Sequence, residues 1–445
     1  MSSDTVRIER ASRRGRSRAA GRSGVWANEA LLFPLIVGVV HWLLVQIPAT
    51  LAFLNVTPRD HSAPYSTLPP PMDGLAHWIV EPMRQWDGLW YRLIAVEGYG
   101  AGSGTAKAAF WPLFPWLMEW GSRITGWSYE TVGYLGANLS FFGALLVVYR
   151  LVSLDFDRAT ARRTLWALAL FPTALFFTAV YTESIFLLLA AASLLAARQG
   201  GWWAAGIFGL LAALTRSAGV MLLAPFAVLF LKQYGTDIRR WFPSIIPAAL
   251  PALGPAIFGW HLTEVGAKFW DFVTVQEQWY RFNATPLETF RCATQGCDAT
   301  LEVYQNGQVP FPVDGADWGW VGAFFDNLSD WTYLGSFTFR NWVGDSDTLE
   351  LSATILAFAL AIIGLRKLPL FYSAFVLPPL VVPLFSPGAV HPLMSMPRFI
   401  LPLFPLFVVI ALLVKDRRIG VPLAVLSAAL LALLSMQFAN WYWVS

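Results

Sequence analysis

The sequence has 445 residues, of which 56% are hydrophobic, 15% are aromatic and only 13% are charged, whereas about 25% of the residues of an ordinary globular domain are charged. This composition, with 22 Trp and 33 Phe, excludes a soluble enzyme, a disordered protein and a nucleic-acid binder. The net charge is only +3. We expect an all-α polytopic membrane protein.

The N-terminal segment is strongly basic, with seven arginines from Arg7 to Arg22 against the two acids Asp4 and Glu9. No apolar run of signal-peptide length follows directly, and no small-residue cleavage site is visible, so no cleaved signal peptide is expected. We expect residues 1–28 to form a cytoplasmic tail that fixes the topology and contacts anionic lipid.

Residues 29–445 are expected to form one transmembrane domain of about eleven helices, because a crossing helix needs about 20 mostly apolar residues. The candidate spans, in chain order, are Leu31–Leu54, Thr131–Val152, Thr164–Val180, Ser184–Ala197, Trp202–Leu214, Ala218–Leu231, Phe242–His261, Leu349–Leu365, Leu370–Phe385, Phe399–Val414 and Ile419–Phe438.

The apolar stretch Ala108–Ile124 decides the topology, because it contains two prolines, Glu119 and Arg123. If it does not cross the membrane, the basic loops all share the side of the N-terminal tail, as the positive-inside rule requires. We therefore expect an interfacial or re-entrant helix there. Two long segments, 55–124 and 262–348, then lie on the extracytoplasmic side, and their length makes both candidates for function.

The two cysteines, Cys292 and Cys297, lie close together in the second of these long segments. If the segment faces an oxidising compartment, they can form a small disulfide loop, and a pair of free thiols is the alternative. Two cysteines are too few for a cysteine-based metal cluster.

Five charged or ionisable residues fall at the outer ends of the predicted spans: Asp87, Glu183, Arg216, His391 and Arg398. Each costs free energy if it is left unpaired near the membrane, so together they predict a functional site. Each also has a structural alternative. Asp87 can cap an interfacial helix, Glu183 can form an ion pair with Arg216, either arginine can anchor lipid headgroups, and His391 can be an ordinary hydrogen-bonded loop residue.

Four aromatic residues surround Asp87 in the sequence: Trp86, Trp90, Tyr91 and Tyr99. They are typical of an aromatic belt at the membrane interface, and the same side chains can stack on the face of a sugar. Both interpretations are compatible, and we include these residues in the candidate substrate site.

Several motifs together resemble the PIG-V family, which comprises GPI mannosyltransferase 2 and its bacterial relatives. The resemblance covers roughly residues 84–405, and any one motif alone would be weak. The motifs are Gln85-Trp86-Asp87 with Tyr99, Ala109-Phe110-Trp111-Pro112-Leu113-Phe114-Pro115, Phe171-Pro172-Thr173, Tyr181-Thr182-Glu183-Ser184, Leu214-Thr215-Arg216-Ser217 with Gly219, and Met396-Pro397-Arg398-Phe399-Ile400-Leu401-Pro402.

The resemblance implies a GT-C glycosyltransferase, in which mannose is transferred with inversion from polyprenyl-phosphate mannose to a lipid-linked or glycolipid acceptor at the extracytoplasmic face. It implies that Asp87 is the general base and that Glu183 is the second acid of the site. Arg398 and Arg216 are candidates to offset the charge of the leaving phosphate. We expect no cofactor and no divalent metal, because a monophosphate donor needs less neutralisation than a nucleotide diphosphate.

Two other functions fit the same features. A transporter or flippase for a lipid-linked sugar would explain the spans, the arginines and the aromatic residues, although it predicts paired half-helices near the bilayer midplane. A protein O-mannosyltransferase would use the same fold and the same donor. The expected partners in the main interpretation are the lipid-linked donor, a lipid or glycan acceptor and membrane lipids, without nucleic acid.

Overall fold

A computed structural model describes residues 3–55, 69–100, 102–298, 301–310 and 346–444. Within these ranges the chain forms helices and turns, and the one isolated β-bridge joins Arg281 to Gly388. The prediction of an all-α chain is therefore confirmed for this part of the protein.

The α-helices of the first half are α1 (Ser3–Asn55), α2 (Leu75–Ile79), α3 (Asp87–Glu97), α4 (Leu113–Thr125), α5 (Tyr129–Asp155), α6 (Arg158–Ala169), α7 (Glu183–Arg198), α8 (Trp202–Thr215) and α9 (Leu223–Tyr234). Those of the second half are α10 (Ile245–Ala248), α11 (Leu253–Glu264), α12 (Asp271–Thr274), α13 (Pro286–Gln295), α14 (Leu301–Gln305), α18 (Ser346–Lys367), α19 (Leu370–Val381), α20 (Met396–Ile400), α21 (Phe404–Leu413) and α22 (Arg417–Ala439).

Five helical stretches in the described residues are long and apolar enough to cross a membrane: Glu29–Asn55, Tyr129–Asp155, Ser217–Tyr234, Asp347–Lys367 and Arg417–Ala439. Shorter apolar helices cover Trp202–Thr215, Leu370–Phe385 and Phe404–Leu413. These helices support the membrane class that the composition predicts.

Three of the eleven predicted spans are interrupted rather than continuous. In the span predicted at Thr164–Val180, the α-helix ends at Ala169, before Pro172. A turn and a short 3₁₀ helix follow it. The span at Phe242–His261 is divided into α10, a 3₁₀ turn and α11, and the span at Phe399–Val414 is divided near Pro402. Proline explains all three breaks, because it lacks the backbone N–H and its ring clashes with the preceding turn.

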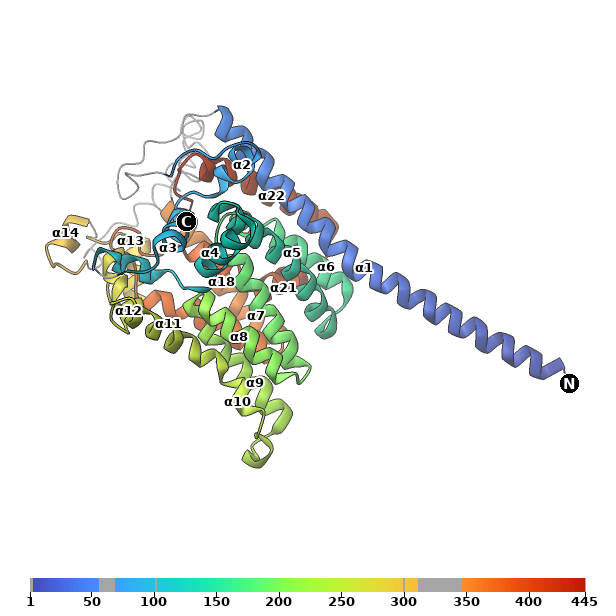
Figure 1. Cartoon of the computed structure of the whole chain (residues 1–445). Helices are drawn as coiled ribbons and strands as arrows, with labels where there is room; N and C mark the ends of the chain where they lie inside the picture. The colour runs from blue at the N-terminus through green and yellow to red at the C-terminus, as the bar shows by residue number, and fades with distance from the viewer. Residues whose placement is uncertain (1–2, 56–68, 101, 299–300, 311–345, 445) are drawn as a thin grey trace.

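The long helices pack as neighbours in a bundle (Figure 1). Helix α5 lies against α7, and α7 lies against α8, whereas α1 runs beside α22, which comes from the other end of the chain. The N-terminal part of α1 projects away from the bundle as a continuation of the same helix.

The stretch Ala108–Ile124 also differs from a plain span. A 3₁₀ helix ends at Ala109, and α4 begins only at Leu113 and has 13 residues, which is too short to cross a bilayer. Helix α4 ends at Thr125, and the next residue, Gly126, caps it in the left-handed conformation with φ of 74°, as glycine commonly does. This short amphipathic helix packs on α3 and α5.

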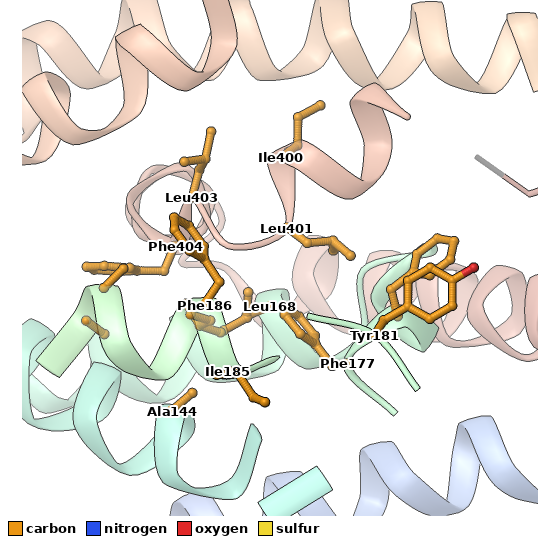
Figure 2. Close-up of a cluster of buried hydrophobic side chains, with 14 of the residues drawn as sticks. Ala144, Leu168, Phe177, Tyr181, Ile185, Phe186, Ile400, Leu401, Leu403 and Phe404 are labelled. Carbon is orange, nitrogen blue, oxygen red and sulfur yellow. The ribbon is translucent and has the colours of Figure 1, made fainter. Parts of the chain in front are cut away.

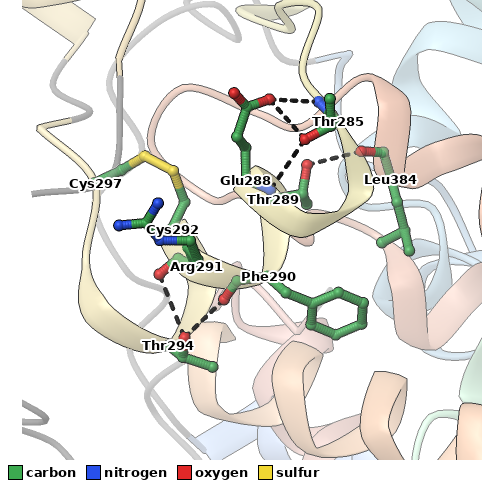
Figure 3. Close-up of a disulfide and its surroundings, with 9 residues drawn as sticks. All are labelled: Thr285, Glu288, Thr289, Phe290, Arg291, Cys292, Thr294, Cys297 and Leu384. Carbon is green, nitrogen blue, oxygen red and sulfur yellow. Dashed lines mark hydrogen bonds between the residues drawn. A yellow bond between two sulfur atoms is a disulfide. The ribbon is translucent and has the colours of Figure 1, made fainter.

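Helix α13 belongs to the long segment between α11 and α18, and a disulfide joins Cys292 to Cys297 at its end (Figure 3). The bonded form of the two cysteines is thus the one present. Thr285 and Glu288 begin the helix with a capping box, in which each side chain accepts a hydrogen bond from the backbone of the other. The hydroxyl of Thr289 donates to the carbonyl of Leu384 at 2.7 Å and fixes α13 to the segment after α19.

Part of the hydrophobic core lies between the region of α7 and the segment that follows α20 (Figure 2). Phe177, Tyr181 and Phe186, from the segment before α7 and from α7 itself, are buried with Leu401 and Phe404, from the segment after α20. Because these side chains are almost completely excluded from solvent, the segments that carry Glu183 and Arg398 are held against each other by apolar packing.

Candidate functional site

Asp87 is the first residue of α3, and a left-handed residue, Trp86 with φ of 56°, sets the direction of the turn before it. The hydroxyl of Tyr181 accepts a hydrogen bond from the backbone N–H of Asp87 at 3.1 Å and donates one to the carbonyl of Gln85 at 3.2 Å. Trp86 occupies the N-cap position, so Asp87 is not the N-cap residue that the structural alternative required. Its carboxylate instead accepts a hydrogen bond from Arg398.

Arg398, on α20, joins the two carboxylates of the site. Its Nη1 donates to Oδ2 of Asp87 at 2.6 Å, and its Nε donates to Oε1 of Glu183 at 3.1 Å. The guanidinium lies over the ring of Tyr181, 4.6 Å from the ring centroid. Burial alone would lower the pKa of Arg398, but the carboxylates of Asp87 and Glu183 outweigh this effect and raise that pKa above its ordinary value. Arg398 therefore stays charged.

Glu183 begins α7, and its side chain is fully buried. It accepts a second hydrogen bond from Nη1 of Arg216 at 2.6 Å. The ion pair between Glu183 and Arg216 that the structural alternative proposed is thus present, but it continues through Arg398 to Asp87. These four residues, Asp87, Glu183, Arg216 and Arg398, form a neutral group that we call the site cluster.

Arg216 directly follows α8, and the chain then turns so tightly that the backbone at Gly219 lies against the end of α8. The backbone N–H of Gly219 donates to the carbonyl of Arg216 at 2.9 Å. A Cβ at Gly219 would lie 2.3 Å from the backbone nitrogen of Ala213, so only glycine fits there. The guanidinium of Arg216 also lies over the ring of Phe399, 5.3 Å from the ring centroid.

The members of the site cluster differ in their access to solvent. The side chains of Asp87 and Arg216 are 15% and 14% exposed, whereas those of Glu183 and Arg398 are 0% and 6% exposed. Asp87 and Arg216 are therefore the groups that a ligand can reach. The second carboxylate oxygen of Glu183, Oε2, is buried without a hydrogen-bond partner among the described residues.

Tyr91 lies one helical turn after Asp87 on α3, close to the carboxylates of Asp87 and Glu183. Its hydroxyl and that of Thr182 are 3.3 Å apart. Burial raises the pKa of Tyr91, and the carboxylates of Glu183 and Asp87 raise it further. Its phenol therefore keeps its proton at neutral pH and remains a hydrogen-bond donor.

The three other predicted aromatic residues, Tyr99, Trp90 and Trp86, have different surroundings. Tyr99 is 2% exposed and donates to the carbonyl of Phe110 at 2.7 Å, so it packs inside the protein rather than facing a ligand. Trp90 stacks on Phe110 and meets the ring of Trp279 edge-on, and its indole N–H is buried without a partner among the described residues. Trp86 packs on two aromatic residues near the C-terminus, Trp441 and Trp443.

The structure places His391 apart from the hydrogen bonds of the site cluster. Its Nδ1 lies 2.7 Å from Oδ1 of Asp347, at the beginning of α18, and the side chain is 37% exposed. The geometry resembles the loop interaction that we gave as its structural alternative.

Two charged residues that the sequence analysis did not select, the buried Glu350 and the half-buried Arg281, support the loop before Arg398. Oε1 of Glu350 accepts from the backbone N–H of Ser395 at 3.2 Å, and Arg281 donates to the carbonyls of Ser386 and Met394 at 2.7 and 3.1 Å. A sequence signal for Glu350 exists, because it is an acid inside a predicted span. Arg281 carries no such signal, since it lies in a polar segment.

A second ion network lies on another side of α3. Arg84 pairs with Glu81 and Glu130 at 3.0 and 3.1 Å, and Arg92 pairs with Glu130 at 2.8 Å. We call these four residues the α5 network, since Glu130 belongs to α5. The network borders a cleft of about 530 Å³ that Trp127 also lines.

Asp87 and Glu183 bring two carboxylates into one cluster, and carboxylates are suitable ligands for a hard cation. Within the ranges that the structure describes, no group of three or more His, Cys, Asp or Glu side chains is arranged to hold a metal ion. The oxygens Oδ2 of Asp87 and Oε1 of Glu183 are already bonded to arginines. The donor set therefore suits guanidinium groups better than a metal ion.

No known protein-family model matches the sequence, and a search of curated proteins returned no match.

Proposed function

We propose that the protein is an inverting glycosyltransferase of the GT-C type, with about eleven transmembrane helices, that transfers mannose from polyprenyl-phosphate mannose to a lipid-linked or glycolipid acceptor. The observation that carries the proposal is the site cluster. Its four residues come from four separate parts of the chain, and each part carries one of the motifs that resemble the PIG-V family.

Asp87 is the general base in this proposal. The acceptor hydroxyl oxygen attacks C1 of the sugar on the face opposite the phosphate, and its proton moves to the carboxylate of Asp87. The bond between C1 and the phosphate oxygen breaks, and the phosphate leaves with the electron pair. One displacement at C1 inverts its configuration, so the site needs no second nucleophile. Because Asp87 is partly exposed while Glu183 is fully buried, Asp87 is the carboxylate that an acceptor can reach.

The two arginines take different roles. Arg398 uses Nη1 and Nε on the two carboxylates, so it orients Asp87. Among the described residues, Arg216 uses only Nη1 in hydrogen bonds, to Glu183 and Thr182, which leaves donors for a phosphate oxygen. A guanidinium next to the leaving group stabilises the charge that develops there.

The aromatic residues near Asp87 provide a surface for the sugar. Trp90 lies three residues after Asp87 on α3, and its indole N–H is buried without a partner among the described residues. A sugar hydroxyl can accept that hydrogen bond, which removes the cost of an unsatisfied donor. The proposal places this site on the extracytoplasmic face, with the N-terminus in the cytoplasm, following the distribution of basic loops.

The test is mannose transfer by Asp87→Asn, which keeps the size of the side chain and removes its charge. With purified protein, radiolabelled polyprenyl-phosphate mannose and a membrane lipid extract as acceptor, we expect transfer to fall by about 10²–10⁴-fold, with donor binding retained. Asp237→Asn is the control, because Asp237 is exposed and pairs locally with Arg240. Transfer at the wild-type rate in Asp87→Asn would contradict the proposal.

The same assay separates the alternatives. The transferase needs the acceptor and keeps its activity in EDTA, whereas a flippase moves the donor across liposomes without any acceptor. Mass spectrometry of the product identifies the acceptor, and mannose found on protein Ser or Thr would point to a protein O-mannosyltransferase instead.

A further inference from the structure

A cleft of about 510 Å³ lies where the apolar part of α1 begins and α5 ends. Helix α5 has 27 residues, so its two ends are roughly 40 Å apart by helical rise. Glu130 and the α5 network are at the other end of α5, and the cleft shares no lining residue with the site cluster. Its lining residues are Glu29, Ala30, Leu31, Leu146, Tyr149, Arg150, Ser153, Leu154 and Arg158.

The five lining residues of α5 form one continuous face. Leu146, Tyr149, Arg150, Ser153 and Leu154 follow the spacing of three and four residues that places side chains on one side of a helix. The face combines apolar side chains with a guanidinium and a hydroxyl. This face of α5 is therefore amphiphilic, and it lines the cleft together with the exposed Leu31 of α1.

The positive charge of Arg150 is uncompensated in the described part of the chain. No carboxylate there forms an ion pair with Arg150, which is exposed. The nearby acid, Glu29, is already engaged, since it accepts from Tyr149 at 2.9 Å and pairs with Arg162 and Arg158. Arg150 lies five residues before the end of a candidate membrane-crossing helix, where a long basic side chain reaches the membrane interface and can contact lipid headgroups.

Ser153 supplies an independent observation. Its hydroxyl oxygen is buried and has no hydrogen-bond partner among the described residues. A buried polar atom without a partner costs about 1–3 kcal/mol, so native proteins rarely leave one unsatisfied. Ser153 lies three residues after Arg150 on the same face of α5, and both residues line the cleft.

We propose that this cleft binds the headgroup of an anionic phospholipid. The phosphodiester oxygens accept hydrogen bonds from Arg150 and from the hydroxyl of Ser153, and an acyl chain covers Leu31 and Leu146. A lipid fits better than free phosphate, because the leucines at the mouth of the cleft, Leu31 and Leu154, are 54% and 52% exposed. The proposal does not depend on the proposed enzymatic function.

The test is native mass spectrometry of the purified full-length protein in detergent with phosphatidylglycerol, phosphatidylcholine, undecaprenyl phosphate or inorganic phosphate as probe. We expect wild-type protein to retain phosphatidylglycerol in preference to phosphatidylcholine. Arg150→Gln should weaken the phosphatidylglycerol complex roughly fivefold, and Ser153→Ala should weaken it by a smaller factor. Arg366→Gln is the matched control, because Arg366 is an exposed arginine at the end of another crossing helix, α18.

Three outcomes would overturn the proposal. The first is equal retention of the two phospholipids by the wild-type protein. The second is an equal loss of phosphatidylglycerol in Arg150→Gln and Arg366→Gln, which would indicate a general surface charge effect. The third is displacement of phosphatidylglycerol by equimolar undecaprenyl phosphate or by inorganic phosphate, which would assign the cleft to the lipid carrier or to a free anion.

Discussion

The site cluster and the α5 network have the same composition, two arginines and two acids, and both touch the region of α3. They differ in the hydrogen bonds that their side chains make to groups outside the four residues. In the α5 network, Glu81 also accepts from the backbone N–H of Met72 and contacts His77, and Arg84 also donates to the carbonyl of Pro70. In the site cluster, Oε2 of Glu183 has no partner among the described residues.

The two networks also differ in the segments that they join. The α5 network connects residues between Glu81 and Glu130, whereas the ion pair of Arg398 with Asp87 spans 311 positions of sequence. Pairing of charges is therefore common to a structural network and to a candidate active site. The site cluster is distinguished because its charged side chains come from four distant parts of the chain.

We expect the largest effects on stability and on mannose transfer from neutralising the glutamate that pairs with two arginines in each network. Glu183→Gln and Glu130→Gln both leave two guanidinium groups without their shared carboxylate. We expect each to lower the free energy of unfolding by about 3 kcal/mol, measured by SDS titration in bicelles. We expect Glu183→Gln alone to reduce mannose transfer by more than about a hundredfold, because only this acid supports Arg398 beside Asp87.

Equal losses of transfer in the two variants would remove the distinction between the networks. Activity is compared per folded molecule, at a temperature where both variants remain monodisperse in size-exclusion chromatography.

A smaller effect on mannose transfer is expected from Arg398→Lys, which keeps the positive charge and loses the planar guanidinium group. One ammonium group cannot reproduce the bonds of Nη1 and Nε to two different carboxylates. Loss of one charged hydrogen bond predicts a fall in kcat of roughly tenfold to a hundredfold. Arg84→Lys is the counterpart in the α5 network, and its transfer rate should match the wild type. A wild-type kcat for Arg398→Lys would show that Arg398 contributes charge alone.

The smallest effect is expected from Tyr181→Phe, which removes the hydroxyl that connects Gln85 and Asp87. The loss of these hydrogen bonds should cost about 1 kcal/mol of stability and lower kcat several-fold, with little change in KM. Tyr234→Phe provides the control, because the hydroxyl of Tyr234 contacts Ser244 at 2.9 Å away from the site. If the two variants keep the same kcat, the hydroxyl of Tyr181 does not position Asp87.

The sequence predicted the members of the site cluster because charges at the ends of apolar segments are rare and conspicuous. It did not predict the order of their contacts, which depends on how α20 packs against α7. The interrupted spans near Pro172, Pro247 and Pro402 were missed because hydropathy counts apolar residues and ignores the missing N–H of proline. The roles of Glu350 and Arg281 were missed because each acts through backbone groups of a loop whose path the sequence does not reveal.

The long separation between Asp87 and Arg398 has a consequence for biogenesis. The ribosome delivers both acids of the site cluster well before it delivers Arg398, so a nascent chain that has already placed α3 and α7 lacks one of the cations that neutralise them. Arg216 alone then balances Glu183. A premature stop codon before position 398 would therefore yield a polypeptide in which the carboxylate of Asp87 lacks its guanidinium partner.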